Sequence, residues 1–81
     1  MHYVYILQDL QQNTYVGYSH DLKQRLKNHV HKEVSSTKKY SDVRLVWYCA
    51  FEDKTKALAF EKYLKAGSGH AFAKKHLAAA R

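Results

Sequence analysis

The sequence predicts a small α/β (α+β) fold, in which a three-stranded antiparallel sheet is flanked by helices in the order ββαβαα. Two runs of β-branched, aromatic and aliphatic side chains, residues 2–8 and 44–51, have the composition of buried strands. Helical spacing of apolar side chains and capping residues place helices between and after these runs. The chain has 81 residues, of which 46% are hydrophobic, so we expect a single domain spanning residues 1–81.

The first two strands form a predicted hairpin. Residues 2–8 are almost continuously apolar, which indicates a strand buried on both faces. Residues 9–13 are polar and turn-like, and residues 14–18 form a second short strand. Because side chains alternate along a strand, a suitable register would bring Tyr5 and Tyr15 onto the same side of the sheet.

A first helix is predicted over residues 21–32. Asp21 suits its first turn by charge. Residues 33–42 then read as a polar loop, before the third strand at residues 44–51. In the first helix, apolar residues recur every four positions and form a core stripe of Leu22, Leu26 and Val30.

The second helix should be capped by Asp53 or Thr55 and should run to about Ala66. A third helix is predicted over residues 71–80. Three strands cannot cover both faces of their own sheet, so we expect the helices to pack on more than one face. Gly67, Ser68 and Gly69 are expected to form the turn that ends the second helix. A phosphate-binding role for this segment is the less favoured alternative.

The charge balance favours a polyanionic partner. The formal net charge is +7, from 14 Lys and Arg against 7 Asp and Glu, and no acidic residue follows Glu61. The pI is about 9.6, as in many nucleic-acid-binding domains. A solubilising surface is the alternative explanation. The basic residues expected to contact nucleic acid are Lys38 and Lys39 in the polar loop, and Lys74 and Lys75 in the third helix.

Several classes of protein are excluded by composition. Cys49 is the only cysteine, so an intramolecular disulfide cannot form, and the histidines lack the spacing of a zinc site. No apolar run approaches the ~20 residues needed to span a bilayer, and no signal-peptide pattern opens the chain. We therefore expect a cytoplasmic protein without a membrane partner.

Four further features are candidates for a functional site. Gly17 shares a strand face with Tyr15, and could let a backbone or a phosphate approach closely, although packing alone would explain these residues. Arg25 and His29 lie one helical turn apart, at the border between the core stripe and solvent. The alternative is an ordinary surface arginine with a histidine nearby, which is a common arrangement. Glu61 projects towards the core face of the second helix, which is costly unless the carboxylate is paired or binds a metal ion.

In this order and spacing, the residues resemble the GIY-YIG nuclease superfamily over nearly the whole chain. Tyr3-Val4-Tyr5 and Tyr15-Val16-Gly17 take the places of its two strand motifs, with Tyr5 and Tyr15 ten residues apart. The chain is most similar to the short, single-domain bacterial members described as excinuclease-subunit-C-like. It departs from the strict pattern because Tyr3 replaces the first Gly and Val replaces both Ile. Arg25, His29 and Glu61 follow in the family's order.

The resemblance implies a metal-dependent endonuclease that hydrolyses a phosphodiester bond, with DNA as the expected substrate. Glu61 would hold one Mg²⁺ or Mn²⁺ ion, and Tyr5 would act as general base with support from Tyr15. Arg25 would stabilise the charge on the phosphate. His29 could orient Tyr5, contact the phosphate or carry a proton. The alternatives are a catalytically silent nucleic-acid-binding module and a subunit of a DNA repair complex, and a partner protein is expected to help in targeting.

Overall fold

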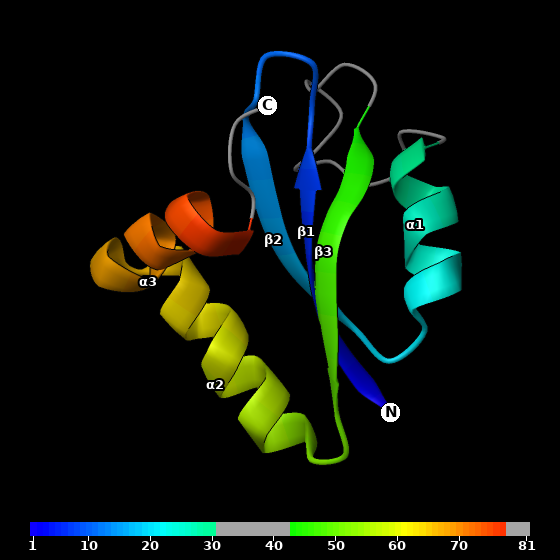
Figure 1. Ribbon diagram of the computed structural model, residues 1–81. Helices are drawn as coiled ribbons and strands as arrows, with labels where there is room; N and C mark the ends of the chain where they lie inside the picture. The colour runs from blue at the N-terminus through cyan, green and yellow to red at the C-terminus, as the bar shows by residue number, and fades with distance from the viewer. Residues whose placement is uncertain (31–42, 78–81) are drawn as a thin grey trace.

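The computed structural model describes residues 1–30 and 43–77, and contains one antiparallel sheet with helices on both faces (Figure 1). The strands are β1 (His2–Gln8), β2 (Thr14–Ser19) and β3 (Arg44–Phe51), in the spatial order β2-β1-β3. The helices are α1 (Leu22–Val30), α2 (Lys54–Lys65), α3 (Gly67–Phe72) and the π-helical segment η2 (Ala73–Leu77). The predicted fold class is therefore confirmed.

β1 is the central strand because it can bury both of its faces. Its residues from Val4 to Gln8 are all buried, as the continuous apolar run predicts. The turn at residues 9–13 is held by Asp9, whose carboxylate accepts hydrogen bonds from the backbone N–H of Asn13 at 2.8 Å and from its side-chain amide at 3.0 Å. Gln12 in this turn has a positive φ of 68°.

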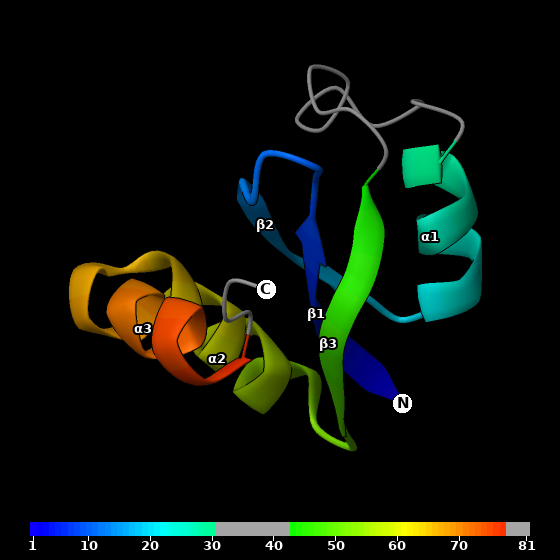
Figure 2. The same ribbon diagram turned by 45° about the horizontal axis from the view of Figure 1, so that its top comes forward.

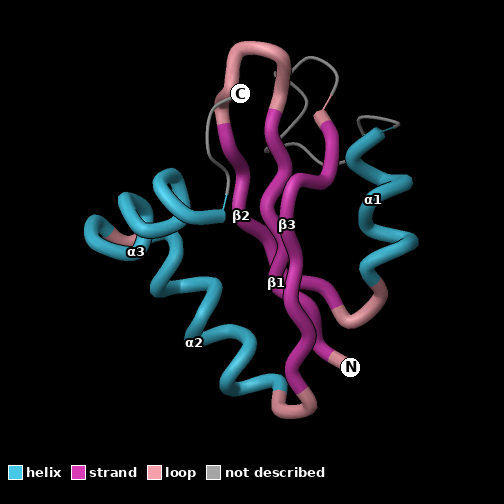
Figure 3. The backbone as a smooth tube through the Cα atoms, viewed as in Figure 1, coloured by secondary structure: helices cyan, strands magenta, loops and turns pink. Residues whose placement is uncertain are grey.

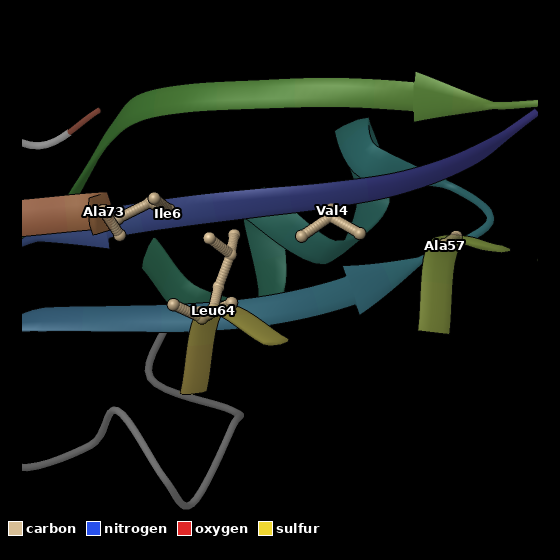
Figure 4. Packing of buried hydrophobic residues seen from close by; sticks show 6 residues of the cluster. Val4, Ile6, Ala57, Leu64 and Ala73 are labelled. Carbon is tan, nitrogen blue, oxygen red and sulfur yellow. The ribbon is translucent and has the colours of Figure 1, made fainter. Parts of the chain in front are cut away.

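One face of the sheet, which we call the core face, packs against α2 and the helices that follow it. Alternate residues of β1 point to this face, and Val4 and Ile6 have no solvent exposure. Both lie opposite α2 and η2 side chains in Figure 4. The buried cluster contains Val4, Ile6, Val16, Ala57, Leu64 and Ala73.

The opposite face, which we call the tyrosine face, carries Tyr3, Tyr5 and Tyr15 and lies on the side of α1. Figures 1 and 2 show α1 on one side of the sheet, with α2 and α3 on the other. Helices cover both faces, as the number of strands requires. Asp21 starts α1 by accepting a hydrogen bond from Gln24 N at 3.1 Å. The predicted end of this helix at residue 32 and the predicted loop at residues 33–42 lie outside the described residues.

α2 begins as predicted at Asp53, whose carboxylate accepts a hydrogen bond from Thr55 N at 2.9 Å. A short connection joins β3 to this helix (Figure 3). On the β3 side of α2, Phe60 packs against Trp47 and Phe51, with ring centroids 6.0 and 5.8 Å apart. Within the described residues, no helix has the length and apolar character needed to cross a membrane.

The prediction that residues 67–69 form a turn is wrong, because α3 begins at Gly67. The chain changes direction at Ala66 alone, which is extended and whose carbonyl accepts a hydrogen bond from His70 N at 2.6 Å. Gly69 is buried where a Cβ atom would overlap the backbone carbonyl of Tyr63. Glycine at position 69 permits close packing of α3 on α2. The helix expected over residues 71–80 therefore begins four residues earlier than predicted, at Gly67.

Candidate active site

The hairpin register brings two phenols together on the tyrosine face. Tyr5 lies opposite Gly17, and Leu7 lies opposite Tyr15, so Tyr5 and Tyr15 are diagonal neighbours on the same face. Their ring centroids are 6.4 Å apart, with an angle of 47° between the ring planes. The sequence left the register open, and the observed register places both residues on one side of the sheet.

Gly17 makes room for the phenol of Tyr5. A Cβ atom at position 17 would overlap Cζ and Oη of Tyr5 and would lie 2.9 Å from Cε2. The ring therefore lies across β2 at a point where any larger residue would displace it. This gives Gly17 a packing role within the protein, and contact of Gly17 with nucleic acid stays a prediction.

Tyr5 and His29 form a buried hydrogen-bonded pair. The phenol oxygen is 2.9 Å from Nε2 of His29, and the two residues are 1% and 2% exposed. The imidazole also lies against the ring of Tyr15, with centroids 5.2 Å apart. His29 comes from α1, so one helix and two strands together form a cluster of three rings.

Burial keeps both members of this pair neutral. Burial raises the pKa of the Tyr5 phenol well above its ordinary value, with smaller effects from Tyr15 and Glu61, while Arg25 opposes the shift. Burial also lowers the pKa of His29, and the charge of Arg25 adds to that effect. A phenol is a stronger hydrogen-bond donor than a neutral imidazole. We therefore assign the proton of the bond to Tyr5, which donates to Nε2 of His29.

Arg25 supplies the positive charge on the α1 side of the cluster. It is half-buried and lies one helical turn before His29. It borders a hollow of about 240 Å³ that is also lined by Ser19 and Asn28. Its charge favours ionisation of the Tyr5 phenol and lowers the pKa of His29.

Glu61 reaches the same region from α2. Its side chain is 19% exposed, and its charge contributes to the raised pKa of Tyr5. The carboxylate is paired with Lys65, whose Nζ lies 3.1 Å from Oε2. The same ammonium lies 6.0 Å from the ring centroid of Tyr15, at the outer limit of a cation–π contact. The carboxylate is thus paired, as its partly buried position requires, and its partner is a lysine of the same helix.

Sequence reasoning therefore missed Lys65. The spacing of four residues between Glu61 and Lys65 is a detectable signal for a helical ion pair. Such pairs are common on solvated helices, and nothing in the sequence distinguishes one that also contacts Tyr15.

The donor groups fit one type of metal site. No group of three His, Cys, Asp or Glu residues that could hold a metal ion occurs among residues 1–30 and 43–77. A closed, all-protein metal site is therefore absent from this part of the chain. Mg²⁺ characteristically keeps several waters and binds through one or two carboxylates together with substrate phosphates. Glu61, a partly exposed single carboxylate, fits that type of site.

The lysines predicted to bind nucleic acid are not part of this cluster in the described structure. Lys38 and Lys39 lie outside the described residues. Lys74 and Lys75 are both exposed on η2, and their contact with nucleic acid stays a prediction. A larger hollow, of about 490 Å³, is lined by Tyr3, Tyr48 and the first turns of α1, and contains none of the predicted catalytic residues.

Comparisons with known proteins bear on the family and the fold of the chain. The family model of the GIY-YIG catalytic domain matches residues 1–75. The chain is 35% identical over 66 residues to a UPF0213 protein of Clostridium perfringens, covering 80% of this chain and 71% of that protein. It is also similar to the solution NMR structure of a UPF0213 protein from Bacillus halodurans. That match has a TM-score of 0.58 and 29% identity, and covers 94% of this chain and 85% of the other.

Proposed function

Since the chain belongs to the GIY-YIG family of nuclease domains, we propose that it is an endonuclease that hydrolyses a phosphodiester bond with one Mg²⁺ or Mn²⁺ ion. The observation that carries the proposal is the convergence of separate elements on one cluster. Tyr5 and Tyr15 come from the hairpin and His29 from α1. Glu61 comes from α2 and is linked to the cluster by Lys65, whose Nζ lies 3.1 Å from its carboxylate and 6.0 Å from the ring centroid of Tyr15. We propose DNA as the substrate, which the net charge of +7 would attract.

Arg25 would bind the scissile phosphate. Arg25 is half-buried, so water screens its charge less than at an open surface. A guanidinium can donate two parallel hydrogen bonds to phosphate oxygens, which fixes the orientation of the phosphate as well as its charge. Arg25 would therefore stabilise the negative charge that builds up in the transition state.

Tyr5 would act as general base by passing its own proton to His29. Its raised pKa makes a free phenolate unfavourable, so direct ionisation does not supply the base. The hydrogen bond of 2.9 Å to His29 offers another route. Tyr5 would take a proton from the attacking water while its own proton moves to Nε2 of His29. The water oxygen bonds to phosphorus, the bond to the leaving oxygen breaks, and that oxygen takes a proton from solvent.

The proton accepted by His29 has an electrostatic cost and a compensation. Arg25 disfavours a second positive charge on the nearby imidazole. A bound phosphate brings negative charge into the same region, which favours the imidazolium. Proton transfer is therefore expected only with substrate in place, and free protein keeps the pair neutral.

Glu61 would be the protein ligand of the metal ion. A single carboxylate leaves the other coordination positions to water and to phosphate oxygens. When bound, the ion would polarise the phosphoryl group and stabilise the leaving oxygen.

The proposal is tested by cleavage of branched, nicked and single-stranded DNA, with and without Mn²⁺. We expect Glu61→Gln and Arg25→Ala each to lower the rate by roughly 10²–10³, with unchanged circular dichroism spectra. Matched controls are Glu52→Gln and Lys27→Ala, which remove the same charges at exposed positions. Wild-type cleavage by Glu61→Gln would disprove the metal role of this carboxylate.

A catalytically silent nucleic-acid-binding module is the second candidate, and two observations favour it. The pKa of Tyr5 is raised, and Lys65 already pairs with the carboxylate of Glu61. Such a module would bind DNA with steep salt dependence. Its affinity would not change on addition of Mn²⁺, and no substrate would be cut.

A further inference from the structure

We propose that Lys65 is an exchangeable cation of the active site, which neutralises Glu61 until a divalent ion binds and then contacts the substrate phosphate. This inference rests on the proposed function, because it assigns a role towards the same ion and the same substrate. It adds a residue for which neither the family match nor the sequence comparisons provide a role.

The position of the ammonium group carries the inference. Nζ of Lys65 lies 3.1 Å from Oε2 of Glu61 and 6.0 Å from the ring centroid of Tyr15. It therefore lies beside both a member of the phenol pair and the one carboxylate proposed to bind metal. An ion pair without a role at the site would need only the contact with Glu61, not the position beside Tyr15.

The pair is suited to exchange because it is weak. The side chain of Lys65 is 51% exposed, so water screens its attraction to the carboxylate. A divalent ion carries twice the charge of an ammonium group, and oxygen ligands are those it prefers. Binding of the ion at Glu61 would repel the nearby ammonium and release it from the carboxylate.

The released ammonium would remain near the substrate. The α2 backbone holds Lys65 one helical turn after Glu61, and the flexible side chain keeps Nζ within reach of the site. A phosphate held by Arg25 from the α1 side would present other oxygens to Lys65 from the α2 side. Two cations on different helices would then bind one phosphate, and neither would need to move its helix.

Ion binding without substrate tests the exchange directly. Titration calorimetry with Mn²⁺ alone should show about two- to tenfold tighter binding for Lys65→Met than for the wild-type protein, because a competing cation has been removed. Methionine is a good helix former of similar length, so α2 should be preserved. Lys62→Met is the matched control. It removes the same charge from an exposed position on the same helix, and should leave Mn²⁺ affinity nearly unchanged.

Cleavage at saturating Mn²⁺ tests the second half of the proposal. Lys65→Met should cut at least about tenfold more slowly, despite its tighter ion binding, because the phosphate loses a charged donor. Lys65→Arg keeps the charge and should restore most of the rate. The combination of higher ion affinity with a lower maximal rate separates this role from simple destabilisation, which would weaken both.

The outcomes distinguish this inference from the proposed function. If Glu61→Gln abolishes Mn²⁺ binding while Lys65→Met binds as the wild type does, the exchange is disproved and the metal role of Glu61 stands. If Glu61→Gln binds Mn²⁺ like the wild type, the metal role and the exchange both fail. A normal maximal rate for Lys65→Met would disprove the phosphate contact.

Discussion

Replacing Gly17 by alanine should disable the cluster by displacing a single ring. The added methyl group would overlap Cζ and Oη of Tyr5 and lie 2.9 Å from Cε2. Carbon atoms in ordinary contact are roughly 3.5–4.0 Å apart, so the ring must move by about 1 Å. The ring is buried, with 1% of its surface exposed, and its movement would break the hydrogen bond to His29.

The expected cost follows from these two effects. Overpacking a buried site costs about 1–3 kcal/mol, and loss of one hydrogen bond costs about 0.5–1.5 kcal/mol. We therefore expect the free energy of unfolding to fall by about 2–4 kcal/mol, a large part of the total for a domain of this size. In urea, the unfolding midpoint should fall by about 1–2 M. Nucleic-acid cleavage under folding conditions should fall at least about tenfold, because the general base is misplaced.

Gly67→Ala is the control for this experiment. A Cβ atom at Gly67 would meet nothing within 4 Å, so the same chemical change should be neutral or stabilise by about 0.4–1 kcal/mol. Urea denaturation followed by circular dichroism measures both variants. If Gly17→Ala matched Gly67→Ala in stability and cleaved normally, the placement of the Tyr5 ring across β2 would be refuted.

Three other predictions concern different parts of the chain. Gly69→Ala should destabilise more than Gly17→Ala, because the obstacle is the backbone carbonyl of Tyr63. Loss of helical circular dichroism on mild heating measures this, and an unchanged melting curve would contradict it. Burial lowers the pKa of His29, so below about pH 6.5 the unfolded chain binds more protons than the folded protein. The free energy of unfolding should therefore decrease as pH falls below 6.5, and should level off below the pKa of His29 in the folded protein. Urea titrations from pH 8 to pH 5 should show this decline, and His29→Gln should reduce its slope. Changing Lys74 and Lys75 together to alanine should lower the slope of log affinity against log salt for DNA by roughly 2, and an unchanged slope would exclude both from phosphate contact.

Local patterns predicted much of the fold because the relevant signals lie within short segments. The bounds predicted for β1 and β3 agree with the structure. For β1 the reason is burial on both faces, which needs a continuous apolar sequence. Side-chain type limited the cap of α2 to Asp53 or Thr55, and the structure shows Asp53 as the cap. The start of α3 was missed because glycine usually ends helices. The reason for Gly69 lies in its contact with the carbonyl of Tyr63, which spacing does not reveal.

The sequence by itself determined the fold class and the family resemblance. Both follow from periodicity and order along the chain. Only the tertiary structure decided the register that puts Tyr5 and Tyr15 on one face, the buried hydrogen bond between Tyr5 and His29, and the pairing of Glu61 with Lys65 beside Tyr15. Protonation depends on burial and on charges brought together from different elements. These quantities exist only once the hairpin, α1 and α2 have packed around one another.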